Sequence, residues 1–230
     1  MLKRFDFHTH TRYSDGTCSH AEMVQAAVAR GMEALAFTDH GPELRVGVSR
    51  EKMEQMLEEI KIAGEEAEIP VLAGIEANVV NRYGSLDVEE DFIKKIDLLS
   101  IGIHDIEEIY LGDNAHEYLS RATRAIERQR VDVFCHPFFF NVDLLPSLSR
   151  EEIEDFVDLA AEKNVAMEVN VKYKIPGDDF IRLCLKKGVK LSIGSDAHRI
   201  TEVGKIDWAL SVLRRTGAKR EDLIFNNFIR

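Results

Sequence analysis

The stretch Phe5-Asp6-Phe7-His8-Thr9-His10 decides the fold. Alternate side chains of a β-strand point to the same side, so a strand here presents His8 and His10 together. The next residues, 11–17, contain no apolar run and include an Asp-Gly turn signal, which predicts a loop. That loop keeps Asp15 near the same strand end. We therefore expect half of a metal site at the end of the first strand.

The same pattern of a short apolar run with a polar end repeats along the chain. Strands are expected at 34–40, 70–76, 97–104, 131–137, 165–170 and 191–196. Helices with an apolar stripe are expected at 20–30, 49–66, 89–95, 116–130, 149–163 and 178–187, and the residues after 205 are helical or irregular. Ser19, Ser49 and Ser149 are the expected N-caps.

Seven strands that alternate with helices or long loops are typical of a parallel α/β barrel, and equally of an open doubly wound sheet. Histidines and acids at nearly every strand end favour the closed barrel, because a ring of strands lets these side chains converge. No Gly-rich dinucleotide or phosphate loop follows any strand. No linker or low-complexity run divides the chain, so we expect one domain over residues 1–230.

Composition limits the class of protein. Hydrophobic residues make up 45% and charged residues 31%, which is ordinary for a soluble domain. The formal charge of -11 argues against a nucleic-acid partner. Three cysteines without a CxxC pair, and an N-terminus without an apolar stretch, predict a cytoplasmic protein with no disulfide and no membrane association. The oligomeric state stays open.

Nine side chains at or near predicted strand ends are candidate metal ligands. They are His8, His10, Asp15, His40, Glu76, His104, His136, Asp196 and His198. Imidazoles and carboxylates without thiolates favour zinc, manganese or iron. Nine ligands are too many for one ion and suggest three ions, or two with a third held loosely. His20 and His116, at helix starts, are expected to be structural, and Cys135 to face away from His136.

The segments FDFHTH, SDG, TDH, GIE, GIH, CHP and GSDAH, in this order, resemble the PHP (polymerase and histidinol phosphatase) superfamily. The resemblance covers almost the whole chain. It implies a distorted (β/α)7 TIM-like barrel, a trinuclear metal centre and phosphoesterase activity. It also implies three ligand sets: His8, His10, Glu76 and Asp196; Glu76, His104 and His136; Asp15, His40 and His198.

The reaction we expect is hydrolysis of a small phosphate monoester by a metal-bound hydroxide. Glu76, Asp196 and His198 are the expected catalytic residues, and zinc is the first choice of metal. Three basic residues near the barrel mouth are candidates for gripping the phosphate: Arg12, Lys172 and Arg199. Asp6 and Asp39 either orient ligand imidazoles or serve the structure alone.

Four alternatives remain open. A phosphodiesterase or 3'-5' exonuclease fits the family but not the acidic charge. A histidinol-phosphatase is possible, but no feature is dedicated to an imidazolium. An amidohydrolase-type C-N hydrolase also begins with an HxH strand, but it usually has a carboxylated lysine where this chain has Glu76 and His104. A non-catalytic metal-binding protein is disfavoured because all nine ligands are present.

Overall fold

The structure, a computed structural model, describes residues 1–105 and 114–229. Within these residues, seven parallel strands form one sheet in the order β1-β2-β3-β4-β5-β8-β9. The strands are β1 (Phe5–Asp6), β2 (Ala34–Phe37), β3 (Val71–Asn78), β4 (Leu98–Gly102), β5 (Val133–Phe134), β8 (Ala166–Asn170) and β9 (Leu191–Gly194). Each follows its predecessor in space as in sequence, apart from a small hairpin described below.

The first and last strands of this sheet are joined by backbone hydrogen bonds. Phe7 N donates to Ile193 O at 2.9 Å, and His10 N donates to Ala197 O at 2.8 Å. The sheet is therefore a nearly closed barrel, as expected, and not an open doubly wound sheet. Since all the strands run in parallel, their carboxyl ends meet at one mouth of the barrel.

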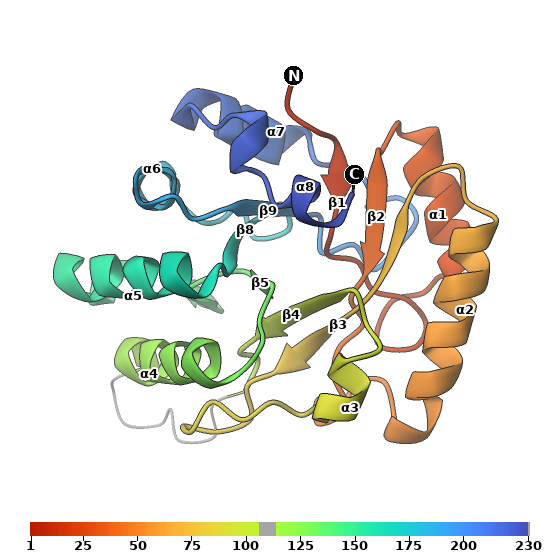
Figure 1. The fold of residues 1–230 in the computed structure, drawn as a ribbon, viewed down its shortest axis with the longest axis horizontal. Coiled ribbons are helices and arrows are strands. Elements are labelled where there is room, and N and C mark those ends of the chain that lie inside the picture. The colour runs from red at the N-terminus through yellow and green to blue at the C-terminus, as the bar shows by residue number, and fades with distance from the viewer. Residues whose placement is uncertain (106–113, 230) are drawn as a thin grey trace.

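Helices surround the strands (Figure 1). They are α1 (His20–Ala29), α2 (Met53–Glu65), α3 (Glu90–Ile93), α4 (Asn114–Arg128), α5 (Arg150–Lys163), α6 (Asp178–Lys187), α7 (Asp207–Thr216) and α8 (Phe225–Phe228). Helices α1 and α2 cover one side of the strands, and α4, α5 and α6 cover the opposite side. Ser19 and Ser149 each form a capping box with the glutamate three residues later, which explains where α1 and α5 begin.

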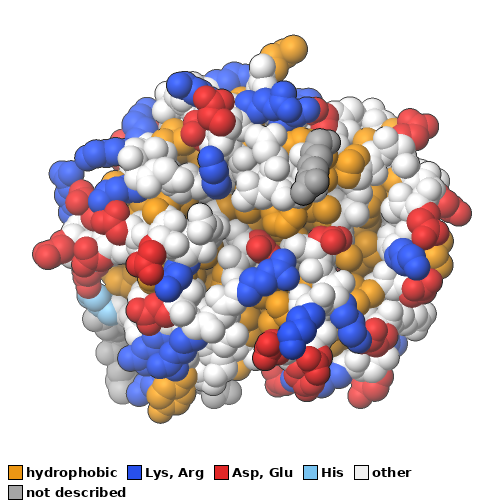
Figure 2. Space-filling view, in the orientation of Figure 1, with side chains coloured by type: hydrophobic (Ala, Val, Ile, Leu, Met, Phe, Trp, Pro, Cys, Tyr) orange, Lys and Arg blue, Asp and Glu red, His pale blue; other side chains and the backbone are white. Residues whose placement is uncertain are grey.

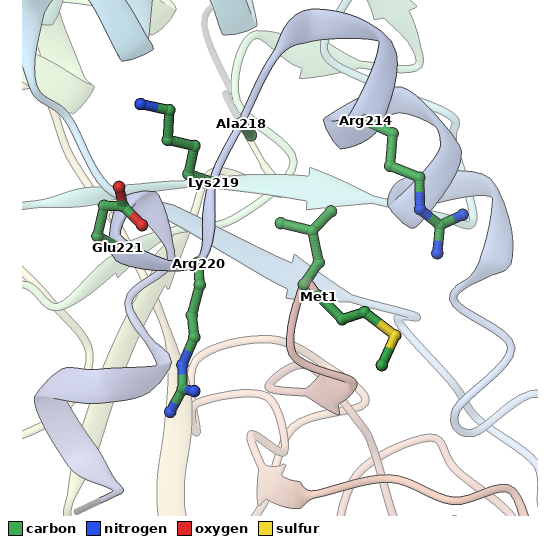
Figure 3. A pocket seen from close by; sticks show the side chains of 7 residues that line it. Met1, Arg214, Ala218, Lys219, Arg220 and Glu221 are labelled. Carbon is green, nitrogen blue, oxygen red and sulfur yellow. The ribbon is translucent and has the colours of Figure 1, made fainter.

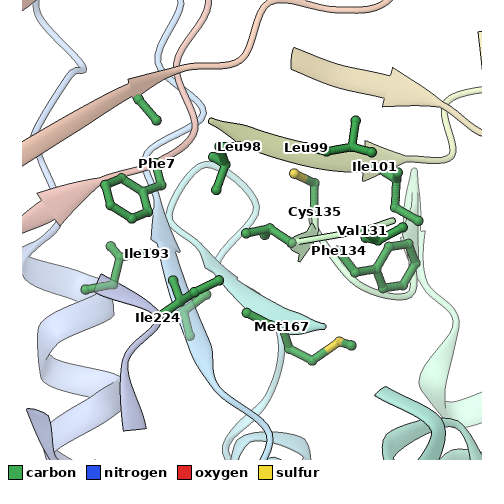
Figure 4. Packing of buried hydrophobic residues seen from close by; sticks show 14 of the residues in the cluster. Phe7, Leu98, Leu99, Ile101, Val131, Phe134, Cys135, Met167, Ile193 and Ile224 are labelled. Carbon is green, nitrogen blue, oxygen red and sulfur yellow. The ribbon is translucent and has the colours of Figure 1, made fainter. Parts of the chain in front are cut away.

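The core consists of apolar side chains carried by the strands. Phe7, Leu98, Phe134, Met167 and Ile193 are at most 1% exposed and gather among β4, β5, β8 and β9 (Figure 4). Burial of such side chains supplies most of the driving force for folding. The polar side chains that follow them at the strand ends are thereby fixed at the barrel mouth.

Three local expectations differ from the structure. Ser49 makes no side-chain capping bond, because a 3-10 turn (Arg50–Lys52) precedes α2 and Lys52 N bonds to Ser49 O. Strand β3 continues two residues beyond Glu76, since it still pairs with β4 there. A hairpin of β6 (Phe139–Phe140) and β7 (Val142–Asp143) was not expected, and Asn141 turns it with a positive φ of 57°.

Charges on the surface are mixed. On the face shown in Figure 2, Asp and Glu side chains are interspersed with Lys and Arg side chains. The helices of residues 1–105 and 114–229 include none long and apolar enough to cross a membrane.

Candidate metal centre

His8, His10 and Glu76, here called the inner group, meet inside the barrel mouth. The Nε2 atoms of His8 and His10 are 3.0 Å apart, and they lie 3.3 and 3.7 Å from Glu76 Oε2. All three side chains are at most 1% exposed. A separation of about 3 Å between two ligand nitrogens is that of neighbouring ligands on one ion.

Glu76 also faces three further imidazoles. Its Oε1 lies 2.9 Å from His136 Nε2 and 3.3 Å from His104 Nε2, and its Oε2 lies 2.9 Å from His40 Nδ1. The two oxygens of one carboxylate thus face different sets of nitrogens. This is the geometry that a carboxylate bridging two ions requires.

Asp15, His40 and His198, here called the outer group, lie nearer the surface. Asp15 Oδ1 is 3.1 Å from His198 Nε2 and 3.7 Å from His40 Nε2. The side chains of Asp15 and His198 are 32% and 17% exposed. His10 also offers a ligand atom to this group, so the inner and outer groups adjoin.

Asp196 is buried and contacts both His10 of the inner group and Lys172. Its Oδ1 is 3.5 Å from His10 Nε2 and 3.0 Å from Lys172 Nζ. Both Asp196 and His136 have a positive φ, 55° and 28°. Non-glycine residues in this region are uncommon and cluster at functional sites, where surrounding contacts hold the strain.

The protonation states of Glu76 and His10 suit metal binding. Burial raises the pKa of Glu76, but His104, His8 and His40 outweigh burial and hold this pKa well below its usual range. Burial and the nearby His40 lower the pKa of His10 to about 3. At neutral pH these groups are therefore a carboxylate and a neutral imidazole, the forms that bind metal ions.

Three donor atoms at this site lack a hydrogen-bond partner, which also suits an ion. Glu76 Oε2, His40 Nδ1 and His104 Nε2 are buried and make no hydrogen bond among the described residues. These three residues form one group whose ligand atoms lie within 4.8 Å of one another. Buried polar atoms without partners are costly, and a divalent cation among them would remove that cost. The nine predicted ligands are thus brought together around a place that suits cations.

A family model described as the PHP domain matches residues 6–172, well over half of the chain. The chain belongs to the PHP domain family. The family expected from the sequence is confirmed.

Two relatives and one solved structure illustrate the PHP match. The chain is 29% identical over 231 residues to a probable phosphatase of Thermoanaerobacter sp. (strain X514), covering 96% of this chain and 89% of that protein. It is 25% identical over 225 residues to the DNA polymerase/3'-5' exonuclease PolX of Bacillus subtilis, covering 95% of this chain and 38% of that protein. Histidinol phosphate phosphatase from Lactococcus lactis, solved with zinc, L-histidinol and phosphate, superposes with a TM-score of 0.73 at 19% identity, covering 95% of each chain. At this identity the likeness confirms the barrel fold alone.

Two residues of this PHP site were not predicted from the sequence. The Glu168 carboxylate lies 2.7 Å from His8 Nδ1 and accepts from His136 N at 2.5 Å. The Oδ1 atom of Asn78 lies 2.7 Å from His104 Nδ1. Partners of this kind orient an imidazole and fix its tautomer. Two features of the sequence could have indicated them. Asn78 follows Glu76 by two residues on β3, so both side chains point to the same side of the strand, and Glu168 is an acid within an otherwise apolar strand.

The expected orientation of Cys135 was wrong. Its thiol groups with His8 and Glu168, with ligand atoms within 4.8 Å, so it does not point away from the site. Strand β5 ends at Phe134, and the positive φ of His136 breaks the alternation on which the prediction relied. Burial raises the pKa of this thiol above its usual range.

Asp6 and Asp39 serve the structure and do not bond to ligand imidazoles. Asp6 accepts from Ser195 N and Gly204 N, both at 2.8 Å. Asp39 accepts from the backbone and hydroxyl groups of Thr11 and Ser14, at 2.6 to 3.2 Å. Asp39 therefore ties down the loop that carries Asp15.

Of the three basic residues predicted to contact phosphate, one contacts a predicted metal ligand and two are exposed to solvent. Lys172 is at the site through its contact with Asp196. Arg12 is 60% exposed and reaches Glu59, with Nη2 3.4 Å from Oε2. Arg199 is exposed directly after His198.

The two histidines expected to be structural lie apart from the ligands. His20 is buried at the start of α1, with Nδ1 3.7 Å from Glu59. His116 is half-exposed on α4, and its Nε2 lies 3.0 Å from Glu152 Oε1.

A hollow of about 470 Å³ lies away from the metal centre, beside the residues that precede β1. Met1, Arg214, Lys219 and Arg220 line it (Figure 3). The three basic side chains extend in different directions and do not converge on one point. This arrangement points to no ligand.

Proposed function

We propose that this chain hydrolyses a small phosphate monoester at a centre of three divalent ions, with zinc the first choice and manganese or iron as alternatives. One observation carries the proposal: the imidazoles and carboxylates of separate strand ends converge around Glu76. The PHP family and its relatives named as probable phosphatases support the phosphoester class.

We assign the residues to three sets. His8, His10, Glu76 and Asp196 hold one ion, Glu76, His104 and His136 a second, and Asp15, His40 and His198 a third. Ions bound there would lower the pKa of a bound water from ~16 toward ~7 and so provide a nucleophile at neutral pH.

The chain's own catalytic residues have separate tasks in this proposal. Glu76 belongs to both the first and the second ligand set, so its two oxygens would keep these two sets in a fixed relation. Asp196 orients the Lys172 ammonium, which is partly exposed and can donate to a phosphoryl oxygen. His198 is held by the contact of its Nδ1 with Asp196 O at 2.9 Å, so its Nε2 stays directed at Asp15. Arg12 and Arg199 are further proposed phosphate contacts, reached by rotation of exposed side chains.

In the overall reaction, water oxygen bonds to phosphorus, the ester P–O bond breaks, and the leaving alcohol takes a proton. The inner group is buried, and the exclusion of water from it strengthens each electrostatic contact made there. The partly exposed side chains of Asp15, His198 and Lys172 form the side from which substrate can enter.

The test combines elemental analysis with hydrolysis of two chromogenic esters. We expect two to three ions per chain, turnover of p-nitrophenyl phosphate with zinc or manganese, and slower turnover of bis-p-nitrophenyl phosphate. Chelation should abolish activity and lower the melting temperature, because ligands that bind only the folded state stabilise it. Fewer than two ions without turnover of either ester would refute the proposal.

A preference for the diester would favour the phosphodiesterase or exonuclease alternative, and digestion of single-stranded DNA with manganese would then follow. Release of phosphate from histidinol phosphate in preference to other monoesters would identify a histidinol-phosphatase. Turnover of an amide or amine substrate in place of both esters would favour the C-N hydrolase alternative.

A further inference from the structure

A hollow of about 850 Å³ lies beside the metal centre. Asn78, which lines it, is the residue whose side chain contacts the predicted ligand His104. Asp105, directly after His104, lines it as well. The hollow therefore begins one side chain away from the ligands, and its volume is in the range of small-molecule sites.

Four arginines line this hollow: Arg45, Arg50, Arg82 and Arg121. Arg45 and Arg50 come from the segment between β2 and α2, Arg82 follows β3, and Arg121 is on α4. No lysine lines the hollow. The lining holds these four arginines and three carboxylates, those of Glu43, Asp87 and Asp105, whereas the whole chain has a formal charge of -11. A guanidinium presents a planar fork of donors that matches a carboxylate or a phosphate, so arginine is the residue suited to bind these anions.

Carboxylates pair with part of this charge. Arg121 Nε lies 2.8 Å from Glu117 Oε1, and Arg50 Nη1 lies 3.8 Å from Glu89 Oε1. Asp87 is buried, and its oxygens accept from Asn78 N, Asn78 Nδ2 and Glu43 N. Burial raises the pKa of Asp87 from its usual value. Glu43 pairs with Arg50 at 2.7 Å. Among the residues that the structure describes, no carboxylate pairs with Arg45, which is exposed at the rim.

Arg45 is carried by a loop fastened to the site. Val48 N donates to His40 O at 2.9 Å, and Glu43 N donates to Asp87 at 3.1 Å. A Cβ at Gly41 would lie 2.3 Å from Asp87 Oδ1, so this approach of the loop needs glycine. The loop thus holds Arg45 in a fixed relation to the wall that contains Asn78.

The hollow also offers apolar surface. Val80 and Tyr83 line it and are 40% and 61% exposed. An exposed aromatic ring beside cations suits a ligand that has a carbon body and an anionic end.

We propose that this hollow binds the leaving group of the substrate, and that the leaving group carries a second anion, a carboxylate or a phosphate, held by Arg45 with the neighbouring arginines. This inference rests on the proposed function. It narrows the substrate class to phosphate monoesters with a second anionic group.

The test uses phosphonates, which are not hydrolysed. Binding to the metal-loaded protein is measured by calorimetry for three series of equal chain length: alkylphosphonates, ω-phosphonoalkanoates and α,ω-alkane bisphosphonates, with two to five methylenes. We expect one chain length at which an added anion tightens binding about ten-fold, as one charge-assisted contact implies. The better of the two anionic series tells whether a carboxylate or a phosphate is preferred.

Two variants make the test specific. In R45Q the advantage of the second anion should fall about ten-fold relative to the alkylphosphonate of the same length. The control is R150Q, which loses the same charge on α5, where Arg150 pairs with Glu154, and should keep the full advantage. Equal affinity of all three series, or an unchanged advantage in R45Q, would overturn the inference.

Turnover of p-nitrophenyl phosphate by the same preparation separates this inference from the proposed function. Turnover without any gain from the second anion would overturn the inference alone. Absence of turnover would overturn the proposed function, and the inference with it.

Discussion

The inner and outer groups of ligands are built from different parts of the molecule. His8, His10 and Glu76 follow or belong to β1 and β3, and none is more than 1% exposed. Asp15 and His198 lie on loops and are 32% and 17% exposed. Strand pairing in the nearly closed barrel positions the inner group and His40, which forms a parallel bridge with Glu76, whereas loop contacts position Asp15 and His198.

This difference indicates that the inner group is rigid and that the loop ligands of the outer group can adjust their positions. Ligands on packed strands lose little freedom when an ion binds, because folding has already restricted them. The more exposed side chains of the loop ligands keep more freedom in the folded protein, and an ion that binds them restricts it. We therefore expect the inner ions to be retained more tightly than the outer one, and four predictions probe that order.

The largest effect is expected for H10A. His10 lies in the inner group and also faces the outer group, so its loss should reduce activity to the background of the assay and lower the ion content. Phosphatase assays and elemental analysis measure both, and circular dichroism should show a retained fold. The control is H116A, which removes a half-exposed imidazole on α4. Full activity in H10A would end the metal-centre mechanism.

The strand-end ligands could be predicted because two simple rules decide their positions. Period 2 pairs His8 with His10, and parallel strands bring every carboxyl end to the same mouth. The starts of α1 and α5 followed from the cap residues Ser19 and Ser149. These are local rules, and the closed barrel satisfies them all together.

The remaining features depend on contacts that no local pattern encodes. Cys135 turns toward His8 because the backbone at His136 leaves the strand conformation. The tie between Glu168 and His8 joins residues 160 apart in the chain. Arg12 likewise reaches Glu59, which is 47 residues away. Such long-range pairs arise from tertiary packing and not from sequence periodicity.

The next effect concerns Glu168, which we expect to position the inner group. Its carboxylate lies against His8 Nδ1 and accepts from His136 N, and E168Q would place an amide N–H against one of these two nitrogens. We expect metal affinity to fall about 10- to 100-fold, the usual effect of losing such a partner. Zinc titration against a competing chelator measures it.

A matched control for this prediction is E33Q. Glu33 pairs with Lys3 and accepts from Arg4 N, away from the ligands. E33Q should leave zinc affinity unchanged. Equal zinc affinity of E168Q and the unchanged protein would show that Glu168 does not orient His8.

A smaller effect is expected for D15N in the outer group. An amide is a weaker ligand than a carboxylate, so one ion should be lost on dialysis while the inner ions remain. Activity should fall about ten-fold and return when excess zinc or manganese is added, because one charged contact is replaced and not the whole site. Loss of all ions from D15N, or no loss at all, would remove the distinction between the two groups.

The smallest effect compares S19A with S149A. Each serine accepts from the backbone N of the third helical residue, at 3.3 Å for Ser19 and 3.2 Å for Ser149. Loss of either cap should lower the free energy of unfolding by about 1 kcal/mol, measured by urea denaturation. Because α1 begins where the loop carrying Asp15 ends, S19A should also weaken retention of the outer ion, whereas S149A should not. Equal retention in both variants would mean that Asp39, and not the start of α1, fixes that loop.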